Sequence, residues 1–133
     1  MIRTVFAAAC FASLPFAALA ESHITGDAEA GEKVFRKCMA CHAVGADAKN
    51  KVGPVLNGVV GRAVGSIEDF RYSDALQQLN ADGVVWTPEE LAAFLEKPRD
   101  YAKGTKMAFA GLRKEDERQD VIAYLATFGA DGM

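Results

Sequence analysis

The feature that most constrains this chain is a group of two cysteines and one histidine within five residues. The stretch RKCMACHAVG, residues 36–45, holds Cys38, Cys41 and His42 in the spacing C-x-x-C-H. Two thiols at this spacing can add to the two vinyl groups of a haem, and the adjacent histidine can then ligate the iron through its neutral imidazole. The motif therefore predicts one covalently attached haem c per chain, bound through Cys38 and Cys41, with His42 as an axial ligand.

Other uses of the cysteine pair find less support in the sequence. A thiol–disulfide oxidoreductase of the thioredoxin kind carries C-x-x-C beside a βαβ pattern, which this chain lacks. A zinc site needs about four ligands, but His23 is the only other histidine and Cys10 is the only other cysteine. A disulfide across two intervening residues closes too small a loop to stabilise a domain.

The first twenty residues have the pattern of an export signal. Arg3 precedes an apolar stretch from Val5 to Leu19, and the sequence Ala18-Leu19-Ala20 fits a cleavage site. We expect residues 1–20 to be a secretory signal peptide that is cleaved after Ala20. Residues 21–133 would then form a single domain in the periplasm. A retained membrane anchor is the alternative, although the apolar stretch is short for a membrane span.

Periodic apolar residues and capping residues predict a mostly helical domain. Asp27 would cap a first helix, whose inner face holds Gly31, Val34, Phe35 and Cys38, and Ser73 would cap a second helix with Leu76 and Leu79. A third helix would begin with Thr87, Pro88 and Glu90 and end at Pro98. A fourth would begin with Asp116 and Gln119 and end at Gly129 as its cap, with an apolar face of Val121, Tyr124, Leu125 and Phe128. We expect long loops at residues 43–70 and 99–112. The fold class is all-α, with about four to five helices and loops wrapped around one haem, which would supply core that so small a chain lacks.

The second axial ligand has several candidates. Met39 lies inside the motif and cannot reach the opposite face of the ring, while His23 and Met133 lie near the chain ends. Met107 lies in the stretch YAKGTKMAFAGL, whose two glycines allow a close approach to a flat ring. Because methionine commonly pairs with histidine in cytochromes, Met107 is the favoured sixth ligand. Filling of the apolar core is the other role open to a lone methionine.

Several stretches together resemble class I c-type cytochromes, of the mitochondrial kind and its soluble bacterial periplasmic relatives. They are GDAEAGEKVFRKCMACH, KVGPVLNGVVGR, VVWTPEELAAFLEKPRDY, KGTKMAFAGL and DVIAYL, in the family's order. The resemblance covers nearly all of residues 26–128. It implies that the first and last helices cross, with Gly31 and Phe35 meeting Val121 and Tyr124.

The resemblance also implies roles for individual residues at the cofactor. The carbonyl of Pro54 would accept a hydrogen bond from His42 and fix its tautomer. Arg62, Tyr72 and Trp86 match positions that contact the haem propionates. Thr105 and Met107 match positions in the loop that carries the sixth ligand. Phe94 stands where many members have a tyrosine that bonds the ligand sulfur, and Leu76 replaces a polar residue. These two apolar side chains suggest a drier Met107 face.

The charge pattern suggests a docking role. Without its first twenty residues the chain carries 14 basic and 18 acidic residues, a net charge of -4. Residues 36–62 nevertheless hold five basic residues against one acidic, and residues 97–114 hold six against one. We expect these stretches to steer the protein toward acidic, transiently bound redox partners; solvated loops with no partner are the alternative. The net charge does not favour nucleic-acid binding.

These observations favour a soluble periplasmic one-electron carrier with a His/Met-ligated haem c, acting as a monomer and not as an enzyme. By resemblance, its donor would be a membrane quinol–cytochrome c oxidoreductase. Its acceptor would be a terminal oxidase, a photosynthetic reaction centre or a periplasmic reductase. The alternatives are a peroxidase-like haem enzyme or sensor with a labile Met107, and a dedicated subunit of one periplasmic dehydrogenase.

Overall fold

The computed structural model describes residues 23–133. The predicted export signal at residues 1–20 lies outside the described residues. None of the helices within the described residues is long and apolar enough to cross a membrane.

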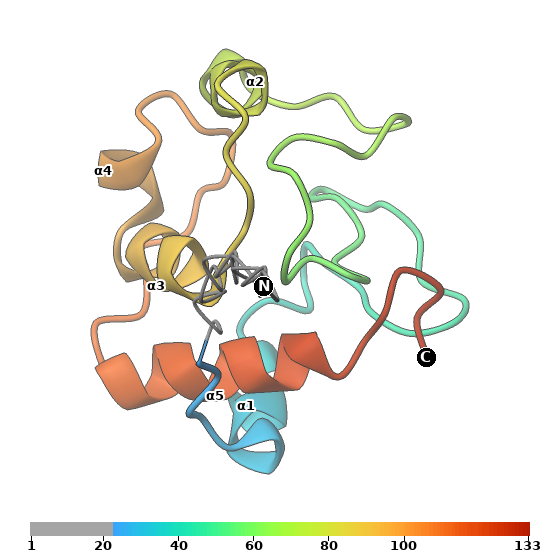
Figure 1. The fold of residues 1–133 in the computed structure, drawn as a ribbon, viewed down its shortest axis with the longest axis vertical. Coiled ribbons are helices and arrows are strands. Elements are labelled where there is room, and N and C mark those ends of the chain that lie inside the picture. The colour runs from blue at the N-terminus through green and yellow to red at the C-terminus, as the bar shows by residue number, and fades with distance from the viewer. Residues whose placement is uncertain (1–22) are drawn as a thin grey trace, which may run out of the picture.

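The described chain is built from helices joined by long loops, as Figure 1 shows. The helices are α1 (Ala28–Phe35), α2 (Asp74–Ala81), α3 (Pro88–Glu96), α4 (Pro98–Tyr101) and α5 (Glu115–Ala126). Strand-like pairing between residues 23 and 133 is limited to one antiparallel bridge, between Ala63 and Val85. The predicted all-α fold with four to five helices is confirmed.

Three of the predicted helix starts are confirmed in atomic detail. The Asp27 carboxylate accepts hydrogen bonds from the backbone N–H groups of Glu29 at 2.8 Å and Ala30 at 3.1 Å. Ser73 caps α2, and the Thr87 hydroxyl accepts from the Glu90 N–H at 3.1 Å. Each cap satisfies donors that the first helical turn leaves without partners.

The boundaries predicted for the last helix are wrong at both ends. Helix α5 begins at Glu115, and no side chain caps it, because the Asp116 carboxylate accepts instead from the neighbouring Glu117 N–H. Three acidic residues in the first turn still favour this helix end through the helix dipole. At the other end Thr127, not Gly129, is the C-cap residue, and its hydroxyl donates to the Tyr124 carbonyl at 2.7 Å.

The predicted loop at residues 99–112 also needs a correction. Pro98 ends α3 but starts α4, because a proline at the first helical position lacks only an N–H that would have had no partner there. The irregular loop therefore starts at residue 102 and is shorter than expected.

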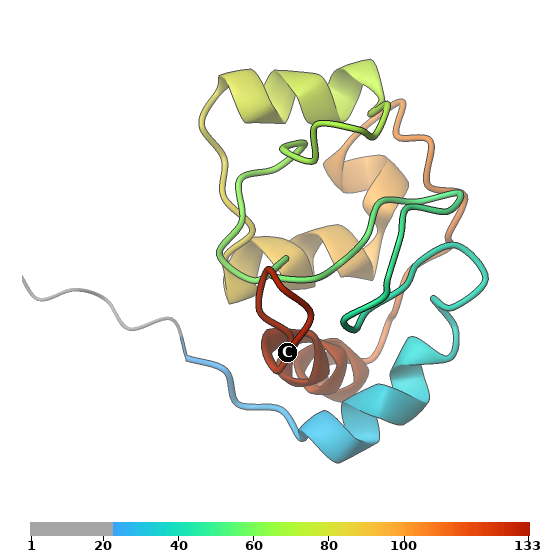
Figure 2. The same cartoon turned by 90° about the vertical axis from the view of Figure 1, so that its right-hand side faces the viewer.

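Helices α1 and α5 cross and pack closely at one end of the molecule, as Figures 1 and 2 show, while α2 lies at the other end. Gly31 makes the approach possible, because a Cβ at that position would lie 1.9 Å from the Asp120 carbonyl oxygen and 2.8 Å from the Tyr124 Cβ. The rings of Phe35 and Tyr124 meet with centroids 5.4 Å apart. The expected contact of Gly31 and Phe35 with Tyr124 is confirmed.

The hydrophobic core joins this helix pair to α3 and the loops. Its most deeply buried members include Val64, Leu112, Val121 and Ile122, which come from two loops and α5. Cys38 and Met107 are both partly buried and both pack against this cluster. The core thus gathers the predicted haem-binding segments around one apolar centre.

Candidate haem-binding site

The C-x-x-C-H motif is held in a tight turn that continues from the end of α1. The Cys38 N–H donates to the Phe35 carbonyl at 2.7 Å, and the His42 N–H donates to the Cys38 carbonyl at 2.9 Å. No disulfide joins Cys38 and Cys41, and both residues are partly buried. Both sulfurs and the imidazole are therefore presented by one short, hydrogen-bonded segment, which is the arrangement that covalent haem attachment requires.

His42 is fixed in the tautomer that an iron ligand needs. Its Nδ1 lies 2.8 Å from the Pro54 carbonyl oxygen. Because a carbonyl can only accept, Nδ1 must carry the hydrogen, which leaves the Nε2 lone pair free to bind a metal. Burial lowers the pKa of His42 from its ordinary value and so favours the neutral, ligating form, while the hydrogen bond to Pro54 acts in the opposite direction. The predicted His42–Pro54 hydrogen bond is present.

Gly53, which the sequence analysis did not single out, makes room for this imidazole. A Cβ at Gly53 would lie 2.3 Å from His42 Cε1 and less than 3 Å from both ring nitrogens. The position just before Pro54 was the available signal, since a glycine next to a proline already marks a tight loop.

The environment of Cys38 argues against thiolate chemistry. Burial raises the pKa of Cys38 to about 11, with Lys37 acting weakly the other way. Reactive cysteines and those that exchange disulfides have lowered pKa values, because the thiolate is the nucleophile. The raised pKa of the partly buried Cys38 thiol therefore does not fit the thiol–disulfide oxidoreductase alternative.

Arg62 has an unused donor that matches an anionic group. Its Nη1 donates to the carbonyls of Val55 at 3.1 Å and Asn57 at 2.9 Å. Its Nε is buried and has no hydrogen-bond partner within the described residues. A buried guanidinium donor without an acceptor is costly. The haem propionates are carboxylates that could supply the missing acceptor, so this atom fits the predicted cofactor.

Trp86 and Tyr72 complete the predicted polar edge of the site. The backbones of Trp86 and Arg62 are paired, since the Trp86 N–H donates to the Arg62 carbonyl at 2.8 Å. Tyr72 is buried, and its hydroxyl accepts from the Ile67 N–H at 3.2 Å, so the hydroxyl hydrogen remains free to donate. The structure brings the backbones of Arg62 and Trp86 side by side, and the propionate contacts of Arg62, Tyr72 and Trp86 stay a prediction.

Phe94 lies in a buried aromatic cluster. Its ring centroid is 5.0 Å from that of Trp86 and 5.7 Å from that of Tyr101. Leu76 on α2 also packs against the core. Neither side chain has a hydrogen-bonding group, so both keep their surroundings apolar.

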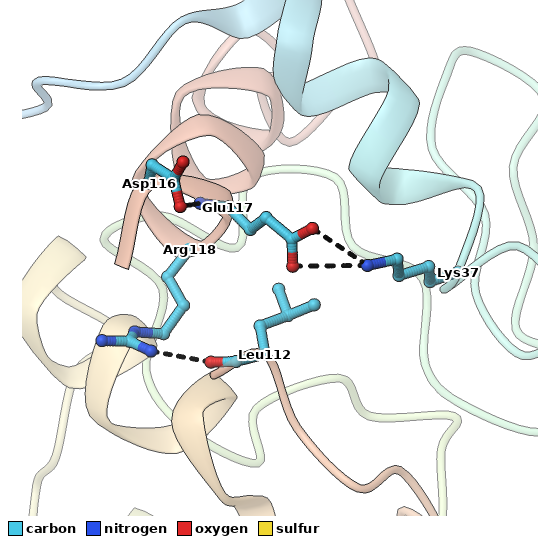
Figure 3. Close-up of polar contacts among 5 residues, drawn as sticks. All are labelled: Lys37, Leu112, Asp116, Glu117 and Arg118. Carbon is cyan, nitrogen blue, oxygen red and sulfur yellow. Dashed lines mark hydrogen bonds and ion pairs between the residues drawn. The ribbon is translucent and has the colours of Figure 1, made fainter. Parts of the chain in front are cut away.

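The loop that carries Met107 is anchored at both ends. At its start, the Thr105 N–H donates to the Ala102 carbonyl at 3.0 Å, and the Thr105 hydroxyl accepts from the Met107 N–H at 3.3 Å. At its end, the Arg118 Nη1 donates to the Leu112 carbonyl at 2.7 Å, as Figure 3 shows. The sequence analysis did not identify Arg118 as a support of this loop.

The helix that carries Arg118 is in turn tied to the haem-attachment segment. Lys37, next to Cys38, forms an ion pair with Glu117 of α5 at 3.2 Å (Figure 3). The end of the Met107 loop at Leu112 and the segment next to Cys38 are therefore both anchored to α5.

Comparisons with known proteins agree with this geometry. The family model of cytochrome c matches residues 28–129. The chain is 61% identical to a cytochrome c-550 of Ancylobacter novellus over 102 residues, which is 77% of this chain and 95% of that protein. It is 52% identical to a cytochrome c2 of Afifella marina over 104 residues, covering 78% of this chain and 84% of the relative.

A solved structure shows the same fold. Cytochrome c2 from Rhodospirillum centenum superposes with a TM-score of 0.73 at 46% identity, over 78% of this chain and 99% of the other. The C-x-x-C-H motif stands where members of the family attach haem c, so Cys38 and Cys41 carry the covalent cofactor. The chain therefore belongs to the cytochrome c family and is an electron-transfer protein, not an enzyme.

Proposed function

We propose that this chain is a periplasmic one-electron carrier whose haem iron is ligated by His42 and Met107. The observation that carries the proposal is the hydrogen bond from His42 to the Pro54 carbonyl, next to the attachment residues Cys38 and Cys41. It leaves Nε2 as a ready ligand on the segment that binds the cofactor. Export would be directed by residues 1–20, and cleavage after Ala20 would leave residues 21–133 as the working domain.

The haem supplies a reversible one-electron couple when bound. His42 and Met107 would hold the iron, and the apolar core around them would keep water away from it. The thioether of Met107 is a soft ligand that favours ferrous iron and a high reduction potential. Arg62 Nε would donate to a propionate, and Tyr72 and Trp86 would line the same edge. Thr105 holds the backbone of Met107, while Phe94 keeps the nearby core apolar.

The surface near the motif suggests how partners dock. Met39 and Val52 are exposed by 53% and 77%, which is high for apolar side chains. Lys51, which directly precedes Val52, links the two segments, since its Nζ donates to the Met39 carbonyl at 2.7 Å. Lys37 and Lys49 are exposed in the same basic stretch. An apolar centre with basic neighbours fits a brief complex with an acidic redox partner.

The partners would be membrane complexes of electron transfer or a periplasmic reductase. We infer a quinol–cytochrome c oxidoreductase as donor and a terminal oxidase, a reaction centre or a periplasmic reductase as acceptor. Relatives at 49–52% identity are cytochromes c2 of Afifella marina and Blastochloris viridis, which supports a role as a general carrier.

The experiment is to measure reduction of the haem-loaded protein by a purified bacterial quinol–cytochrome c oxidoreductase at increasing ionic strength. Electrostatic steering predicts a rate constant that falls by about tenfold or more from low to physiological salt. Lys49→Glu should lower the rate at low salt and flatten the salt dependence. Lys33→Glu makes the same charge change outside the two basic stretches and serves as the control. A rate independent of salt would contradict the docking mode.

A further inference from the structure

A hydrogen bond between α3 and α4 departs from what the sequence pattern predicts. Glu90 stands at the position where the second half of a capping box would bond back to the N–H of Thr87. Instead, its carboxylate accepts a hydrogen bond from the Tyr101 hydroxyl. The Thr87 N–H donates to the Val85 carbonyl at 2.8 Å. The carboxylate has thus been diverted from its own helix to the end of the next one.

Helix α4 is supported locally by the buried Pro98 and by an exposed ion pair between Lys97 and Asp100 at 3.0 Å. It is four residues long, and no side chain caps its first turn. A cleft of about 620 Å³ opens beside it, lined by residues of α3, α4 and the segment 110–113. The partly buried Tyr101 ring packs against Trp86 at 6.1 Å and Phe94 at 5.7 Å between centroids. The bond to Glu90 is therefore a side-chain hydrogen bond that ties the end of this short helix to α3.

The fixed end of α4 leads directly into the loop that carries Met107. Ala102, the next residue, is only 4% exposed. Its carbonyl accepts from the Thr105 N–H, and the Thr105 hydroxyl accepts from the Met107 N–H. A displacement of Tyr101 would therefore reach Met107 through two consecutive hydrogen bonds.

We propose that the Glu90–Tyr101 hydrogen bond is a tether that holds the Met107 loop closed, with both residues acting as positioning residues. The inference rests on the proposed ligation by Met107. Burial, and then the bond to Glu90, raise the pKa of Tyr101 well above its usual range, so the phenol keeps its proton. The tether consequently persists throughout the physiological pH range.

Exogenous imidazole tests the tether, because it can bind the iron only after Met107 has moved away. Ferric, haem-loaded protein is titrated with imidazole while the weak far-red absorption of the iron–thioether bond is followed. Tyr101→Phe keeps the ring but removes the donor. If the bond breaks when the loop opens, the variant should bind imidazole about tenfold more tightly, since a hydrogen bond to a charged group is lost from the closed state alone.

Two further variants separate the tether from other effects. Glu90→Ala should raise the imidazole affinity similarly, and the double variant should add little more, because each change removes the same bond. Glu89→Ala removes a neighbouring, exposed carboxylate from the same helical turn and should leave the affinity unchanged. Glu90→Ala also keeps the test available if Tyr101→Phe fails to fold.

The outcomes are distinguishable. One outcome would overturn the tether: the wild type shows the far-red absorption, but Tyr101→Phe and Glu90→Ala both bind imidazole with unchanged affinity. This holds even if the free energy of unfolding of the variants falls. That result would mean that the bond survives loop opening and has a purely structural role. Absence of the far-red band from the wild type would overturn ligation by Met107, and the tether with it.

Discussion

Replacing Gly53 by alanine tests how closely the protein controls the His42 imidazole. The added Cβ would lie 2.3 Å from His42 Cε1, 2.7 Å from Nδ1 and 2.8 Å from Nε2. Carbon atoms in contact normally stay 3.5–4.0 Å apart, so the ring or the loop must move by about 1 Å. Gly53 does not have a positive φ angle, so the clash with the ring, and not backbone strain, would carry the effect.

The cost follows from what the imidazole has to give up. Inserting a methyl group into a packed site costs about 1–3 kcal/mol. Losing the hydrogen bond from Nδ1 to the Pro54 carbonyl adds about 1 kcal/mol. We therefore expect Gly53→Ala to lower the free energy of unfolding of the haem-loaded protein by about 2–4 kcal/mol. The displaced imidazole should also alter the visible spectrum and the reduction potential.

Chemical denaturation of the haem-loaded protein, with voltammetry of the same samples, measures both effects. Gly129→Ala is the matched control, because Gly129 also lacks a positive φ angle and a Cβ there would come no closer than 3.2 Å, to the end of the Asp131 side chain. The control should change the free energy of unfolding by less than about 0.5 kcal/mol and should leave the reduction potential unchanged within its error. A Gly53→Ala variant that matches the control would refute the reasoning, since the imidazole would then have had room to spare.

Two further predictions concern the core and the Met107 side. Gly31→Ala should lower the free energy of unfolding, measured by chemical denaturation, by at least about 3 kcal/mol. The alanine Cβ would lie 1.9 Å from the backbone of α5, and that backbone cannot move away without separating α1 from α5. A variant as stable as the wild type would contradict this packing. Phe94→Tyr should raise the reduction potential measured by voltammetry, because a hydroxyl that donates to the Met107 sulfur weakens its donation to the iron; an unchanged potential would rule out a dry Met107 face that Phe94 maintains.

Local signals in the sequence predicted the parts of the structure that depend on neighbouring residues. Caps at Asp27, Ser73 and Thr87 were found because each bonds a backbone N–H two or three residues later. The attachment motif was equally local. The position of Pro54 beside His42 came from the family resemblance and not from spacing, since twelve residues separate them.

The predictions fail where residues that are distant in the sequence decide the structure. Nothing local distinguishes Glu90, which bonds Tyr101 eleven residues away, from a carboxylate that completes its own cap. Helix α5 starts without a side-chain cap because packing against α1, and not capping, stabilises it. Gly53 was missed for the same reason, because its importance lies in the space that a distant ring occupies.

The central claim is that His42 and Met107 close both axial positions of the iron. The most direct measurement is the visible spectrum of the reduced, haem-loaded protein before and after the addition of carbon monoxide. The account predicts a haem c spectrum that carbon monoxide leaves unchanged. A prompt shift of the spectrum would contradict it, because a small molecule would then have reached an iron that Met107 does not hold.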